Sequence, residues 1–269
     1  MEFLKIAKRR SFLSELIYVA LQIGLALAVV LVIRATESPW PAIGLVALSK
    51  WRVLAVKPRY WFVNVQANLV DFIVGISMVG FLHTTYASHI GSSQKLFLIV
   101  MFTLLYIGWL LYLKPQSKRY YVVAQAGIAL FSGVTALFVF GFDWPVSVVV
   151  LLMWLIGYAT AHHILASYSE THILFLTLLW AYVMAEFGWL AYHWTIAYGL
   201  GIESVLLPRV ALTVACIGFV MQQAYDSYYH HQKIRGNDIL LPVLFTVSII
   251  VVLPLLLNLL GGANVTIGI

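Results

Sequence analysis

The chain has 269 residues, of which 62% are hydrophobic and only 10% are charged. A soluble domain carries about 25% charged residues, so this composition excludes an ordinary soluble fold. Apolar runs of about 18 residues or more recur along the chain and predict membrane-spanning helices, because backbone polar groups in a bilayer must be satisfied within the protein. The single cysteine excludes an intramolecular disulfide.

The net charge of +6 does not indicate a nucleic-acid partner. The basic residues flank the apolar runs, where they set the orientation of membrane helices and meet anionic lipid head groups. We therefore expect the lipid bilayer as the main partner, with anionic head groups at the cytoplasmic face. A membrane-protein partner is compatible with the same pattern.

The pattern of apolar runs predicts an all-α polytopic membrane protein with one transmembrane domain over residues 1–269 and no soluble domain. We expect about nine transmembrane helices, because that many apolar runs are long enough or nearly long enough to cross. The expected spans are 12–33, 39–56, 61–86, 96–113, 120–142, 145–166, 172–198, 204–229 and 240–260.

The run 12–33 follows a cluster of basic residues, as a secretory signal peptide does. It is longer than a signal-peptide core and lacks a small-residue cleavage pattern, so we expect an uncleaved first span. We expect a multi-pass protein of the cytoplasmic (inner) membrane.

The run 39–56 is short and contains Lys50 and Arg52. It either crosses the membrane with these side chains reaching to the surface, or its part 42–56 is an amphipathic helix in the interface and eight spans remain. If it crosses, 13 of the 16 lysines and arginines fall on the amino-terminal side, and the other side keeps Arg34, Lys95 and Arg209. The positive-inside rule then favours crossing, with the amino terminus cytoplasmic and the carboxyl terminus outside.

Two carboxyl groups lie inside predicted spans, where an ionisable side chain costs about 2.5–3.5 kcal/mol. Asp71 follows Asn64 and Asn68 on one helix face, at the positions i, i+4 and i+7. It lies eleven residues after Tyr60, or roughly 16 Å along the helix, which predicts a depth near the middle of the membrane.

Glu186 belongs to a second stripe, which also contains Tyr182, Trp189 and His193. Its predicted depth is comparable to that of Asp71. If the two carboxyl groups line one cavity, they predict a titratable pair that carries protons or binds a cationic or hydrogen-bonding ligand. The alternative is that each group is bonded to a neighbouring helix and only stabilises the assembly.

Further polar residues stand at the predicted cytoplasmic ends, and four of them are weak metal-ligand candidates: His162, His163, Glu170 and His172. Their spacing matches no metal-binding signature, and neighbouring histidines on a helix project about 100° apart. Histidines at helix ends near lipid head groups are the simpler interpretation. We therefore favour no metal and expect no cofactor.

One segment resembles known sequences. The run Met184–Trp189, followed by His193–Leu200, resembles uncharacterised multi-pass membrane proteins of reduced-genome bacteria over the last third of the chain. That group has no assigned activity, so the resemblance implies a bacterial origin and no particular chemistry.

Three functions remain open. The favoured hypothesis is a small transporter, or a transporter membrane subunit, that uses Asp71 and Glu186 in a midplane cavity. This preference is an argument by protein class, because multi-pass proteins without soluble domains are often transporters. The alternatives are an intramembrane enzyme acting on a lipid or isoprenoid, with the histidines as metal ligands, and a non-catalytic anchoring subunit of a membrane complex. Phosphate-binding loops, dinucleotide fingerprints and nucleophile elbows are missing, which weighs against an enzyme.

Overall fold

The computed structural model describes residues 12–53, 55, 57–141, 143–168, 170–194, 196–199, 206–259 and 264–266. Most of these residues are helical. The α-helices are α1 (Phe12–Thr36), α2 (Pro39–Ser49), α3 (Trp61–Ala87), α4 (Ser92–Gly108), α5 (Arg119–Phe140), α6 (Val146–Ser167), α7 (Ile173–Trp194), α8 (Arg209–His231) and α9 (Gly236–Leu259). Two 3₁₀ turns, Trp51–Val53 and Pro58–Tyr60, connect α2 to α3, and a π-helix, Trp109–Leu113, extends α4.

Six helical segments among the described residues are long and apolar enough to cross a membrane. They are Leu13–Thr36, Pro58–Ala87, Ser92–Leu113, Arg119–Phe140, Val146–Ser167 and Ile173–Trp194. The prediction of a helical membrane protein is therefore confirmed, and six of the expected spans coincide with these segments.

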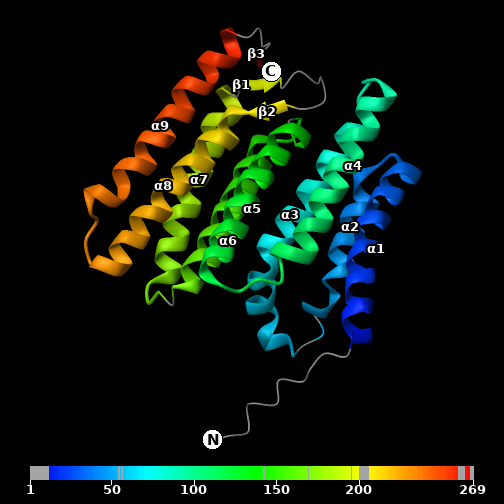
Figure 1. The fold of residues 1–269 in the computed structure, drawn as a ribbon, viewed down its shortest axis with the longest axis horizontal. Coiled ribbons are helices and arrows are strands. Elements are labelled where there is room, and N and C mark those ends of the chain that lie inside the picture. The colour runs from blue at the N-terminus through cyan, green and yellow to red at the C-terminus, as the bar shows by residue number, and fades with distance from the viewer. Residues whose placement is uncertain are drawn as a thin grey trace, which may run out of the picture.

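Consecutive helices run in opposite directions, so their connections alternate between two ends of the bundle (Figure 1). One end, called the basic end below, carries the connections that follow α2, α4, α6 and α8. The other end, called the far end, carries a small sheet that includes the last described residues of the chain (Figure 1). Nine described lysines and arginines lie at the basic end: Lys50, Arg52, Lys57, Arg59, Lys114, Lys118, Arg119, Lys233 and Arg235.

Several element boundaries differ from the sequence-based expectation. Helices α4 and α9 each begin four residues earlier than expected, at Ser92 and Gly236, and three further differences change the connections. The helix expected over 39–56 ends at Ser49, and the chain continues as irregular backbone and 3₁₀ turns. The helix expected over 172–198 ends at Trp194, and the helix expected from 204 begins at Arg209. Two strands replace the helical turns expected there: β1 (Ile196–Gly199) and β2 (Leu206–Pro208), which pair antiparallel.

The third strand, β3 (Asn264–Thr266), pairs antiparallel with the other edge of β1. Apolar periodicity did not reveal these strands, because each is only three or four residues long. The sheet satisfies backbone groups that would otherwise lack helical partners. It attaches the described end of the chain to the connection between α7 and α8.

Helices α3 and α5 lie at the centre of the bundle and are the most buried of the six candidate spans. Helix α3 packs against α2, α4, α5 and α6, and α7 packs mainly against α6. The α6–α7 contact is close because glycines occupy it: a Cβ atom on Gly157 would lie 2.6 Å from Met184 Cγ, and one on Gly188 would lie 2.7 Å from Met153 Cγ. Small residues of this kind let membrane helices approach each other.

Candidate functional site

Asp71 is the centre of a buried charge cluster with Lys50, Lys114 and Trp109. Its Oδ1 atom accepts a hydrogen bond from the indole Nε1 of Trp109 at 2.9 Å. Its Oδ2 atom lies 2.9 Å from the Lys114 ammonium and is also paired with the Lys50 ammonium. The side chain of Asp71 is only 10% exposed, so this carboxylate exchanges most of its hydration for protein partners.

Lys50 reaches this cluster because α2 is short. The helix ends at Ser49, and Lys50 is its C-cap residue, at the level where α2 packs against α3. The sequence suggested that Lys50 extends to the membrane surface beside Lys57 and Arg59. The structure corrects this expectation: the side chain turns inward to Asp71, since a buried carboxylate offers an ammonium group a strong partner.

The π-helix explains how α4 contributes two side chains to the same carboxylate. Trp109 and Lys114 are five residues apart, and the Lys114 amide donates to the Trp109 carbonyl at 2.9 Å. An α-helix turns about 100° per residue and would place residues five apart on different faces. The wider π turn brings both side chains to Asp71, and such turns are frequent at functional sites.

Asp71 is level with the end of the α4 segment. Lys114 follows Leu113, the last residue of the candidate span Ser92–Leu113, and contacts Asp71 directly. The cluster is therefore level with the end of the α4 span, and α3 continues for ten more residues toward the basic end. Two ammonium groups face one carboxylate, which leaves an excess of one positive charge at this level.

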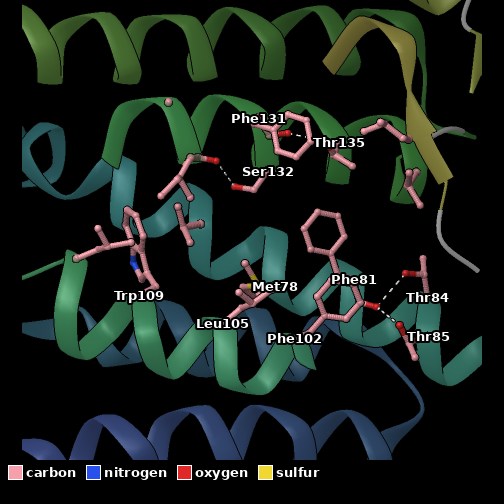
Figure 2. A pocket seen from close by; sticks show the side chains of 16 residues that line it. Met78, Phe81, Thr84, Thr85, Phe102, Leu105, Trp109, Phe131, Ser132 and Thr135 are labelled. Carbon is pink, nitrogen blue, oxygen red and sulfur yellow. Dashed lines mark hydrogen bonds between the residues drawn. The ribbon is translucent and has the colours of Figure 1, made fainter. Parts of the chain in front are cut away.

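A groove of about 600 Å³ begins beside this cluster. Helices α4 and α5 both pack on α3, and the groove lies between them, with α3 as its floor (Figure 2). Its lining is almost entirely apolar and includes Met78, Phe81, Phe102, Leu105 and Phe131. The volume falls within the range of about 300–1,000 Å³ that is typical of small-molecule sites.

Trp109 belongs both to the groove and to the charge cluster. Its ring lines one end of the groove (Figure 2), and its indole nitrogen donates to Asp71. Thr84 and Thr85 lie at the opposite end, near β2. The hydroxyls of both threonines, like that of Ser132, donate to carbonyl groups of their own helices, so the lining offers a ligand little polar contact.

The groove is open on one side. Leu105 on α4 and Phe131 on α5 are 54% and 37% exposed, although both line it. Gly127 on α5 is also exposed, and a Cβ atom there would meet nothing within 4 Å. In a membrane, a ligand could therefore enter sideways from the bilayer without crossing the protein.

Glu186 does not join Asp71 in one cavity. Asp71 is bonded to side chains at the ends of α2 and α4, whereas Glu186 is exposed on α7 and interacts with Tyr182. Tyr182 is 60% exposed, and His193 is exposed at the end of α7, with its ring 5.0 Å from that of Trp189. The predicted stripe is thus real, but it faces away from the bundle.

The remaining candidates have local partners. Asn64 and Asn68 are partly buried on α3, and Asn68 Nδ2 donates to the Asn64 carbonyl at 2.8 Å. They share a helix face with Asp71 but lie outside the charge cluster. The sequence revealed Asp71 itself, but not that Lys50, Trp109 and Lys114 surround it.

The four weak metal-ligand candidates are not brought together as ligands. His162 stacks on Tyr158 with ring centroids 6.0 Å apart, and His163 Nε2 is hydrogen-bonded to Gln125 Oε1 at 2.8 Å. Glu170 accepts a hydrogen bond from the His172 amide at 3.1 Å. Within the described part of the chain, no three histidine, cysteine or acidic side chains are placed to hold a metal ion.

Comparison with known proteins found no matching family, no similar curated protein and no similar solved structure.

Proposed function

We propose that this membrane protein binds a single-chain anionic amphiphile, with the chain in the groove and the head group beside Lys114. The observation that carries the proposal is the continuity between the two parts of the site: Trp109 lines the groove and also bonds the carboxylate that holds Lys114. The ligand class follows from this arrangement of apolar walls and excess positive charge.

The length of the groove suits a hydrocarbon chain that begins at the basic end. Its lining on α3 extends from Val74 to Thr85, eleven residues or roughly 16 Å along a helix. One leaflet of a hydrocarbon core of ~30 Å has a similar depth. An acyl or isoprenoid chain could therefore lie along α3 while its head group stays near the membrane surface.

The charge cluster suits an anionic head group. Asp71 neutralises one of the two lysines, and the Lys114 side chain is 28% exposed. An ammonium group has three hydrogen-bond donors, so Lys114 can contact a phosphate or carboxylate while keeping its bond to Asp71. Lys118 and Arg119 follow within five residues and add positive charge at this end of the bundle.

Among the functions that the sequence left open, this proposal is nearest to the enzyme that acts on a lipid or isoprenoid. It keeps the ligand class of that alternative but includes binding only and no chemical reaction. The transporter hypothesis required Asp71 and Glu186 in one cavity, and the two groups have separate partners. Lipid binding does not require Glu186.

For the arrangement in the membrane, we propose nine crossings in the bacterial inner membrane, with the basic end cytoplasmic and the carboxyl terminus outside. The charge distribution supports this orientation: nine described basic residues lie at one end, and Arg34, Lys95 and Arg209 lie at the other. The three crossings beyond the six long helices would be α2, α8 and α9. The single transmembrane domain over 1–269, and anionic lipid head groups as partners, belong to the same proposal.

The test uses purified full-length protein in detergent and two fluorescent amphiphiles with the same single chain, one with a phosphate and one with a phosphocholine head group. Gly127→Phe places a ring in the groove without a backbone clash. The matched control is Gly24→Phe on α1, where a Cβ atom also meets nothing within 4 Å, outside the groove. We expect G127F to weaken binding of both amphiphiles about tenfold, as loss of an apolar site should.

The head-group contact is tested separately with Lys114→Gln. This variant should weaken binding of the phosphate amphiphile and leave binding of the phosphocholine amphiphile nearly unchanged. If G127F binds both probes as tightly as G24F does, the groove is not the site and the proposal is wrong. If K114Q affects both probes equally, the head-group assignment is wrong.

A further inference from the structure

The outward face of α7 carries polar and aromatic side chains that the groove does not use. Tyr182, Glu186, Trp189 and His193 lie on this face, and all four are exposed. The opposite face of α7 is buried against α6 through Met184 and Gly188. The stripe therefore points away from the bundle along a helix that is apolar and long enough to span a membrane.

Glu186 lies well inside this span. It is thirteen residues after Ile173, or roughly 20 Å along the helix, and eight residues before Trp194, or roughly 12 Å. A glutamate side chain is too short to reach the membrane surface from that depth. Carboxyl groups within membrane helices normally face the interior of an assembly and pair with another group, so the outward position of Glu186 is unusual.

The protein itself satisfies Glu186 only in part. The Tyr182 hydroxyl, one turn away, interacts with the carboxyl group. A carboxylate can accept about four hydrogen bonds, so most of its acceptor capacity remains for a group outside the chain. The exposed rings of Tyr182 and Trp189 flank the carboxyl group and provide apolar contact area on either side.

We infer that this face of α7 binds a transmembrane helix of another protein that carries a lysine or arginine at the depth of Glu186. Charge complementarity determines the chemistry of the partner, because a cation is the strongest partner of a buried carboxylate. The tyrosine and tryptophan supply large, rigid contact surfaces of the kind that dominate interfaces.

A second copy of this chain does not supply the required cation. Copies in one membrane share an orientation, so a symmetric pair would place Glu186 opposite Glu186. The basic residues of the six candidate spans lie within four residues of a span end: Arg34, Arg59, Lys95 and Arg119. Lys50 and Lys114 are bound to Asp71. Within the described residues, the chain therefore offers no outward cation at the depth of Glu186.

The experiment uses the full-length protein reconstituted in phosphatidylcholine vesicles with synthetic membrane-spanning leucine–alanine peptides. One peptide has a single lysine at the depth of Glu186, a second has the lysine two turns nearer its end, and a third has leucine. A membrane-soluble carbodiimide activates the carboxyl group, and an adjacent lysine amine then forms an amide bond that links peptide to protein. Mass spectrometry identifies the linked residues.

We expect the lysine peptide to be linked to Glu186 at least about threefold more than the displaced-lysine peptide, in keeping with the modest strength of polar contacts between membrane helices. Glu186→Gln should abolish the link, and Tyr182→Phe should retain it. Glu186→Lys should become linked to a peptide that carries glutamate at the same depth. Asp71, which is buried with its lysines, is an internal control and should remain unlinked to any peptide.

Two results would overturn the inference. Equal linkage of the matched and displaced lysines would mean that the face does not recognise a cation at a defined depth. The second result is that Glu186 is protected from carbodiimide in the protein alone and loses this protection when the protein is diluted with lipid. That result would mean that a second copy of the chain covers the face.

Discussion

The Lys114 ammonium lies 2.9 Å from Asp71 Oδ2 and joins the end of the α4 segment to the buried face of α3. Lys50 joins the end of α2 to the same carboxylate. One side chain on α3 therefore connects three helical segments near the basic end. Removal of one member of a buried ion pair leaves the others without a counter-charge, which typically destabilises a protein by about 3–5 kcal/mol.

Asp71→Asn should lower the free energy of unfolding by about 3 kcal/mol, because two partly buried ammonium groups would lose their carboxylate. The measurement is thermal or denaturant unfolding in detergent, followed by circular dichroism. Asp143→Asn, on an exposed turn, is the matched control and should unfold like the wild type. An unchanged midpoint for D71N would show that the cluster contributes nothing to stability.

The free-energy cost of inserting a carboxyl group into the membrane indicated, from the sequence alone, that Asp71 needs a partner. It did not indicate which residue that partner is. Lys50 and Lys114 belong to segments that simple patterns place at the membrane surface. Trp109 and Lys114 are brought together only by the π turn, which has no reliable sequence signature. Glu186 shows the opposite case: periodicity grouped it correctly with Tyr182, Trp189 and His193, but could not determine which way the stripe faces.

The α6–α7 interface depends on two glycines. Gly157→Ala and Gly188→Ala should each destabilise the protein by about 1–3 kcal/mol, since the added methyl would overlap a methionine side chain of the facing helix. Gly24→Ala, where a Cβ atom meets nothing within 4 Å, is the matched control and should be neutral or slightly stabilising. Unfolding midpoints of the three variants test this. Equal midpoints would show that α6 and α7 can separate without loss of stability.

Helices α5 and α8 are joined at the basic end by Arg119. Its guanidinium carbon lies 4.2 Å from the ring centroid of Tyr168 and 4.9 Å from that of Tyr229. Arg119→Gln should destabilise the protein by about 1 kcal/mol through loss of these cation–π contacts. Arg119→Lys should restore little of this, because an ammonium group lacks the planar surface that stacks on both rings. The measurement compares the unfolding midpoints of the two variants with that of Lys118→Gln, an exposed control. Identical midpoints for R119Q and K118Q would contradict the prediction.

Tyr168 should make stability depend on pH in the alkaline range. It lies in the turn after α6, and its hydroxyl donates to Asp226 Oδ1 at 2.8 Å. Burial of the ring, together with this hydrogen bond, raises the pKa of the Tyr168 hydroxyl to about 12. The ordinary pKa of tyrosine is about 10, so the unfolded chain loses this proton first as pH rises. The contribution of Tyr168 is therefore fully present below about pH 10 and is lost toward pH 12.

The measurement compares unfolding midpoints of the wild type and Tyr168→Phe from neutral to alkaline pH. The variant lacks the titrating hydroxyl, so its stability deficit relative to the wild type should be largest below about pH 10 and should shrink above it. Tyr120→Phe removes an exposed hydroxyl from the start of α5 and should show no such change. A deficit for Y168F that stays constant across this range would mean that the hydroxyl is not held neutral by the folded protein.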